Sequence, residues 1–174
     1  MKIIIFSFCC CLGSIEPVFG TLNFRIPLRG FKTFEYHLVA FKRVRIPVGS
    51  IQNIRIPFAG ILKYVDFFKI GSYEILREDL LKSVAKTKKK IILSTGMANE
   101  SEIKKAITIL KKNGCKNLAL LHCVSQYPAK IEDCNLKSIK YLSKKFKLDV
   151  GWSDHTRNPL LVFHAIQKFG AKYI

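Results

Sequence analysis

The stretch KIILST at residues 90–95 decides the fold, together with the pattern that repeats on either side of it. It is a short, continuous apolar run, as expected for a strand that is buried on both faces. Four other runs have the same character, namely VDFFKI at 65–70, NLALLH at 117–122, LDVGW at 148–152 and KYI at 172–174. We therefore predict about five strands in this part of the chain.

Amphipathic patterns between these runs predict four helices, at roughly residues 75–86, 99–113, 136–146 and 159–169. The second helix has the clearest ends, because Asn99 can cap it with Glu102 three residues later, and a glycine follows it. Strict alternation of strands and helices with short loops predicts a parallel sheet with right-handed crossovers. An open doubly wound sheet and part of a closed barrel both satisfy this pattern.

The first 60 residues have a different texture, without a sustained period. The tripeptide R-I-P occurs at Arg25, Arg45 and Arg55, without the regular spacing of a repeat architecture. Each proline removes a backbone donor and biases the preceding residue toward extended conformations. We expect an irregular or short-strand segment over residues 1–62, followed by an α/β domain over residues 63–174.

Composition and length limit the function classes. The 174 residues are fewer than the roughly 250 of a complete eight-unit barrel. The net charge of +18 raises the question of a polyanionic partner, but the basic residues are not interleaved with aromatics in a known module, so we expect no nucleic-acid binding. Six cysteines without a C-x-x-C pair predict a reduced, cytoplasmic protein. The apolar residues 3–12 are too short to cross a bilayer as a helix, and we expect no membrane association.

Polar side chains follow each of the first four predicted strands. The carboxyl ends of parallel strands open on one side of a sheet, so these side chains should converge on one mouth. They are Lys69, Ser72 and Glu74, then Ser94 and Thr95, then His122, Ser125, Gln126 and Tyr127, and finally Ser153, Asp154 and His155.

The chemistry of this set suits an anionic substrate. The ammonium of Lys69 supplies a point charge, and serine hydroxyls supply orientable donors to phosphate or carboxylate oxygens. His155 is a candidate metal ligand or general base, and Glu74 is a candidate for orienting a hydroxyl, moving a proton or pairing with Lys69. Each of these residues taken singly also has an ordinary structural explanation, and we interpret His122 as structural.

Four ordered motifs resemble those of the sialic acid synthase family: K-I-G-S-Y-E-I, I-L-S-T-G-M, L-L-H-C-V-S-Q-Y-P and G-W-S-D-H-T. The resemblance covers roughly residues 63–174. Members of this family condense phosphoenolpyruvate with N-acetylmannosamine or a related amino sugar in carbohydrate biosynthesis, and intact relatives are homodimers. The resemblance therefore implies a transferase built on a partial TIM (β/α) barrel.

The resemblance also implies roles for individual residues. Glu74 would lie between the two substrates near the reacting carbons, and His155 would be one of two histidine ligands to a divalent metal, manganese or magnesium. Phosphoenolpyruvate would be bound by Lys69, Ser72, Ser94 and Ser153, and the sugar by Ser125 and Tyr127. Tyr73 stands where the family commonly has glycine.

Some parts of the family's pattern have no match in these 174 residues. They are the first barrel strands, the second metal histidine and the carboxy-terminal antifreeze-like domain. We therefore expect the chain by itself not to turn over substrate. The alternative interpretation is a non-catalytic barrel remnant that binds anions or an intact homologue. The choice among N-acetylmannosamine, the diacetamido precursors of legionaminic and pseudaminic acids, and spore-coat precursors stays open.

Overall fold

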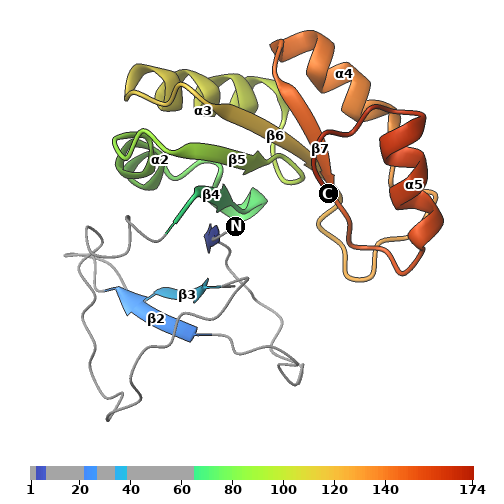
Figure 1. Ribbon diagram of the computed structural model, residues 1–174, viewed down its shortest axis with the longest axis horizontal. Coiled ribbons are helices and arrows are strands. Elements are labelled where there is room, and N and C mark those ends of the chain that lie inside the picture. Colours follow the sequence, from blue (N-terminus) through green and yellow to red (C-terminus); the bar gives the residue numbers. More distant parts are fainter. Residues whose placement is uncertain (1–2, 7–21, 27–33, 39–64) are drawn as a thin grey trace.

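The computed structural model describes residues 65–174 together with three short strands at residues 3–6, 22–26 and 34–38 (Figure 1). The strands are β1 (Ile3–Phe6), β2 (Leu22–Ile26), β3 (Phe34–Leu38), β4 (Phe67–Ile70), β5 (Lys90–Ser94), β6 (Leu118–Cys123) and β7 (Asp149–Ser153). The helices are the 3-10 turn η1 (Ser72–Glu74) and the α-helices α2 (Glu78–Ala85), α3 (Glu100–Lys112), α4 (Lys137–Phe146) and α5 (Pro159–Gln167). The four α-helices are those predicted from the sequence.

The described strands form one sheet in the order β2-β3-β1-β4-β5-β6-β7. Strands β4 to β7 run parallel in chain order, and each is followed by a helix. β1 adds to the outer side of β4 in parallel orientation, while β2 and β3 pair antiparallel. The prediction of an α/β arrangement with short strands in the N-terminal segment is therefore confirmed.

The fifth predicted strand, at 172–174, is not a regular strand. The Lys172 N–H donates to the Val150 carbonyl (2.9 Å) and the Trp152 N–H donates to the Tyr173 carbonyl (2.8 Å). In a regular parallel ladder, Lys172 would donate its N–H to Val150 and also accept the Trp152 N–H through its own carbonyl. Here the carbonyl that accepts belongs to the next residue, Tyr173. The fifth parallel strand of the described sheet is β1, which lies in the segment predicted to be irregular or to form short strands.

The two faces of the parallel sheet differ in what they bury. Large side chains such as Phe68, Leu93, Leu120 and Trp152 pack against the helices in the main core. The opposite face carries a smaller apolar cluster of Phe67, Ile92, Ala119 and Leu121, with Tyr173 packed against it. Both faces are thus apolar, which explains the continuous hydrophobic runs in the sequence.

The parallel sheet curls toward the face with the smaller cluster. Four adjacent strands place β4 and β7 about 14 Å apart if the sheet is flat. The Lys69 Nζ on β4 nevertheless lies 3.4 Å from the Ser153 Oγ on β7. Tyr173, beside β7, likewise contacts Lys90 of β5, with 2.7 Å between its hydroxyl and the Lys90 Nζ. Contacts across this many strands require a curved sheet, as in a βα barrel.

Local sequence signals set the ends and the contacts of the helices. The Asn99 side chain accepts a hydrogen bond from the Glu102 N–H, and the Glu102 carboxylate accepts one from the Asn99 N–H. This capping box confirms the predicted start of α3.

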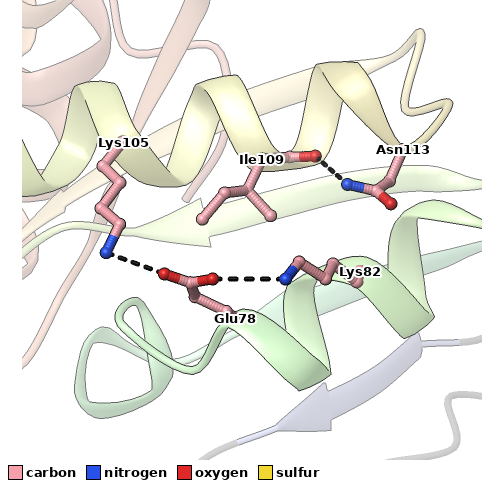
Figure 2. Close-up of polar contacts among 5 residues, drawn as sticks. All are labelled: Glu78, Lys82, Lys105, Ile109 and Asn113. Carbon is pink, nitrogen blue, oxygen red and sulfur yellow. Dashed lines mark hydrogen bonds and ion pairs between the residues drawn. The ribbon is translucent and has the colours of Figure 1, made fainter.

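Glu78 forms two ion pairs at the surface, as Figure 2 shows. One joins it to Lys82 within α2 (3.3 Å), and the other joins it to Lys105 of α3 (2.8 Å). No helix within the described ranges is long and apolar enough to cross a membrane.

Gly151 is required for the close approach of the last residues to β7. A Cβ at this position would lie 2.3 Å from the Tyr173 carbonyl oxygen and 2.8 Å from the Leu121 Cδ2. We predict that Gly151→Ala lowers the free energy of unfolding by about 1–3 kcal/mol, because overpacking displaces backbone. Urea unfolding measures the effect.

The matched control is the same substitution in a chain that lacks residues 172–174. There the backbone clash is gone and only the flexible Leu121 side chain must move, so Gly151→Ala should cost much less. An equal cost in both backgrounds would contradict the prediction.

Candidate active site

The candidate site lies at the carboxyl ends of the parallel strands, on the face that the sheet curls toward. Side chains alternate between the two faces of a strand. Lys69 is two residues after Phe67, Ser94 is two after Ile92, and Cys123 is two after Leu121. Ser153 pairs in register with Cys123. The smaller apolar cluster therefore forms the floor below a polar rim.

Lys69 and Ser153 begin a line of hydrogen bonds across this rim. The Lys69 Nζ donates to the Ser153 Oγ (3.4 Å), and Ser153 Oγ lies 3.2 Å from the His155 Nε2. Burial lowers the pKa of Lys69, while the neighbouring Cys123 acts in the opposite direction. A partly desolvated ammonium is well suited to bind an anion, because little water has to be removed from it.

His155 is held in one tautomer by the backbone. Its Nδ1 lies 2.6 Å from the Val124 carbonyl oxygen, which can only accept, so Nδ1 carries the proton. Nε2 then has its lone pair free to accept a hydrogen bond, and the hydroxyl oxygens of Ser153 and Tyr127 each lie 3.2 Å from it. Burial lowers the pKa of His155, and the charge of Lys69 lowers it further. His155 is therefore uncharged, and its unprotonated Nε2 offers a lone pair toward the site.

Tyr127 covers the outer side of His155. The two rings stack with their centroids 4.2 Å apart at an interplanar angle of 28°. The tyrosine itself is 66% exposed. Its ring is therefore accessible to a ligand entering from solvent.

Ser72 and Ser125 meet although they are 53 residues apart. Their hydroxyl oxygens are 3.0 Å apart, one from η1 after β4 and the other from the loop after β6. Glu74 ends η1 and is 6% exposed. The first and third predicted motifs are therefore joined directly. The buried carboxyl group of Glu74 follows Ser72 by two residues.

Ser94 carries a buried hydroxyl on the same face of the sheet as Lys69 and Ser153. Its hydroxyl is buried, and it has no hydrogen-bond partner among the residues that the structure describes. Such a group is costly unless a partner binds it. Two residues later, Gly96 leaves room for the end of β6, since a Cβ there would lie 2.5 Å from the Cys123 Sγ and 3.0 Å from the Ser125 Oγ.

Other polar residues at the strand ends have structural partners. The Thr95 Oγ1 donates to the Leu121 carbonyl (3.0 Å), and Asp154 accepts from the Thr156 N–H (2.7 Å). His122 Nε2 lies 2.7 Å from the Cys134 carbonyl on the helix-covered face, and burial lowers its pKa. These contacts agree with the interpretation of His122 as structural.

Sequence reasoning missed two contributors to the site, Cys123 and the Val124 carbonyl. Cys123 could have been found from its alternation with Leu121 along β6, which places both on one face. No side-chain pattern points to the Val124 carbonyl, because every residue but proline offers the same backbone groups.

A metal site is not formed by the described residues alone. Within the part of the chain that the structure describes, no three His, Cys, Asp or Glu side chains gather to hold an ion. His155 supplies one nitrogen in the tautomer that a metal requires, but one imidazole does not make a metal site. The predicted set of ligands is therefore not complete here.

Comparison with known proteins identifies the family of this chain. Residues 59–174 match the model of the NeuB family, which is two-thirds of the chain. The chain belongs to the NeuB family. The match begins four residues before the predicted domain boundary at residue 63.

Named synthases are among the relatives of this NeuB chain. It is 56% identical over 92 residues to N,N'-diacetyllegionaminic acid synthase of Campylobacter jejuni, which is 52% of this chain and 28% of the relative. It is 45% identical over 89 residues to pseudaminic acid synthase of Helicobacter pylori, covering 51% of this chain and 26% of the relative. The chain thus spans less than a third of these proteins, and the family is enzymatic.

Two solved structures of related proteins share the fold. The N-acetylneuraminic acid synthetase of Leptospira borgpetersenii, solved with citrate, has a TM-score of 0.62 and 38% identity. The alignment covers 68% of this chain and 42% of that one. The spore coat polysaccharide biosynthesis protein SpsE of Bacillus subtilis also has a TM-score of 0.62, with 37% identity over 64% of this chain and 32% of that one. The prediction of a partial barrel of the sialic acid synthase family is confirmed.

The lowered pKa of Lys69 predicts a specific pH dependence of stability. The unfolded chain holds the Lys69 proton up to the ordinary pKa of 10.5, whereas the folded chain loses it at lower pH. Between these two values the unfolded state binds more protons, so folding stability rises with pH. We predict that Lys69→Met removes this rise, as measured by urea unfolding from pH 7 to pH 10.5.

The stability difference between the wild type and Lys69→Met should therefore change over this pH range, because only the wild type carries the buried amine. A difference that stays constant from pH 7 to pH 10.5 would contradict the prediction.

Proposed function

We propose that this chain carries the phosphoenolpyruvate side of a nonulosonic acid synthase, which condenses phosphoenolpyruvate with an N-acetylated amino sugar. The single observation that carries the proposal is the buried hydroxyl of Ser94 without a partner among the described residues, beside a rim that also holds Lys69 and Ser153. A phosphate or carboxylate oxygen would supply the missing partner of Ser94. Membership of the NeuB family supports the same reaction class.

The residues divide between two substrates in this proposal. Lys69, Ser94 and Ser153 bind the anionic groups of phosphoenolpyruvate, because they combine an ammonium with hydroxyl donors on one face of the sheet. Ser72 is shared, since it contacts Ser125 and so connects this anion site with the sugar side. Ser125 and the accessible ring of Tyr127 contact the amino sugar.

The proposed reaction forms one carbon–carbon bond. The C3 of phosphoenolpyruvate attacks the aldehyde carbon of the open-chain sugar, and the aldehyde oxygen takes up a proton. Water then adds to C2 of the resulting cation and loses a proton. The phosphate leaves with its bridging oxygen by C–O cleavage, and the remaining C2 hydroxyl gives up its proton to become the keto group. Glu74 is the proposed group near the reacting carbons, where a buried carboxyl can orient a hydroxyl or move a proton.

One residue of the proposed site would help to hold a divalent metal ion. His155 is the residue that we propose as one metal ligand, since its Nε2 lone pair faces the rim. A bound Mn²⁺ or Mg²⁺ would polarise the sugar aldehyde as a Lewis acid. Removing the ion from a loaded site should weaken sugar activation and leave the Lys69–Ser153 contact in place.

Isothermal titration with phosphoenolpyruvate tests the proposal. We expect Lys69→Ala to weaken binding about 10- to 100-fold, because a hydrogen bond to a charged group contributes about 1.5–3 kcal/mol. Ser94→Ala should weaken binding by a smaller factor, since its hydroxyl is neutral. Lys172→Ala is the matched control for the loss of one positive charge, and it should bind as the wild type does.

Two outcomes would contradict the proposal. One is no measurable binding to a chain that is folded by circular dichroism. The other is an equal effect of Lys69→Ala and Lys172→Ala, which would mean that anions bind to the basic surface in general and would favour the non-catalytic remnant.

A further inference from the structure

Three loops of the parallel sheet meet at Ser125. The Ser125 Oγ, in the loop after β6, lies 3.0 Å from the Ser72 Oγ of η1, which follows β4. A Cβ on Gly96, in the loop after β5, would also lie 3.0 Å from the Ser125 Oγ, so that loop passes close to the same point. The loops after β4, β5 and β6 are therefore neighbours at one place on the rim, where the first and the last are 53 residues apart in the chain.

Each of these loops carries an exposed apolar side chain next to the meeting point. The three side chains are those of Tyr73 (46% exposed), Met97 (51%) and Tyr127 (66%). Each follows the meeting residue of its own loop by one or two positions. Because successive Cα atoms are about 3.8 Å apart, all three side chains begin within about 8 Å of the residues that meet. We call these three residues the apolar collar.

The local backbone explains why the collar residues are exposed. Both neighbours of Tyr73 in η1 are buried, so Tyr73 is the residue of this turn that faces solvent. Met97 is a central residue of a tight turn, which is closed by a hydrogen bond from the Ala98 N–H to the Thr95 carbonyl (3.1 Å). Exposed apolar side chains that gather beside a polar site are typical of a surface that contacts a ligand with apolar parts.

We propose that the apolar collar contacts the methyl groups of an amino sugar with two acetamido groups, and that it favours such a sugar over one with a single acetamido group. This inference rests on the proposed function, because it concerns the sugar side of the same site. It selects among the amino sugars that the sequence left open. A methyl group is smaller than one aromatic ring, so a single acetamido group does not cover side chains that come from three loops.

An acetamido group fits the collar with both of its parts. Its methyl group can pack against the rings of Tyr73 and Tyr127, or against the polarisable thioether of Met97. Its amide N–H and carbonyl can pair with hydroxyl groups, and the same loops offer those of Ser72, Ser125 and Tyr127. A sugar that carries only hydroxyl groups would leave the collar in water and gain nothing from it.

Saturation-transfer NMR on the full 174-residue chain with saturating phosphoenolpyruvate tests the inference. The probes are N-acetylmannosamine and its analogue with a second acetamido group in place of the C4 hydroxyl. We expect the analogue to bind about fourfold more tightly or better, since burial of one methyl group corresponds to about this factor. The methyl protons of both acetamido groups should receive the most saturation.

Variants of the collar identify the source of the preference. Tyr73→Ser and Met97→Ser should each reduce the preference for the analogue about twofold or more, because each removes apolar contact area. Tyr73→Phe keeps the ring and should keep the preference. Leu160→Ser is the matched control, since Leu160 is also a strongly exposed apolar residue (67%) but lies on α5, and it should change neither affinity.

Three outcomes would overturn the inference. One is equal affinity for the two sugars, or binding of neither, in a chain that binds phosphoenolpyruvate; the phosphoenolpyruvate side of the proposed function would then stand without the collar. Another is a preference that survives Tyr73→Ser combined with Met97→Ser, because the discrimination would then come from other residues. The third is a folded chain that does not bind phosphoenolpyruvate, which would remove the proposed function and this inference together.

Discussion

The curvature of the parallel sheet is the constraint on which the rest of this structure depends. In a flat sheet Lys69 of β4 and Ser153 of β7 would be too far apart to interact, and curvature brings their polar atoms within 3.4 Å. The same curvature lets Tyr173 reach Lys90 below the apolar floor. Rim and floor are therefore two levels of one concave face, and the site exists because the strands turn toward it.

Two glycines allow close approaches between neighbouring segments of the curved sheet. Gly151 allows residues 172 and 173 to lie against β7, and Gly96 allows the loop after β5 to touch the end of β6. Opposite these glycines, the outer face buries large residues such as Phe68 and Trp152 under the helices.

The site combines one charge with several neutral donors, and each is held by a different element. Lys69 comes from β4, Ser94 from β5, Ser125 from the loop after β6, and Ser153 from β7. Strands hold Lys69, Ser94 and Ser153, so binding of the proposed anion would order these side chains little further. The Val124 carbonyl adds to this by fixing the proton on the Nδ1 of His155, which leaves Nε2 as an acceptor at the rim.

The sequence by itself determined the α/β class, the four helices, the start of α3 at Asn99 and the residues of the rim, because these depend on local periodicity, capping and the position of each residue along its strand. It failed where partners are distant in the chain. The pairing of β1 with β4, the irregular course of residues 172–174 and the contact of Ser72 with Ser125 all depend on the packing of segments that no local pattern connects. The tautomer of His155 could not be predicted from the sequence either, because it depends on a backbone carbonyl and every residue has one. Only the tertiary structure decided these features, because they arise from the curvature of the sheet and the space between its strands.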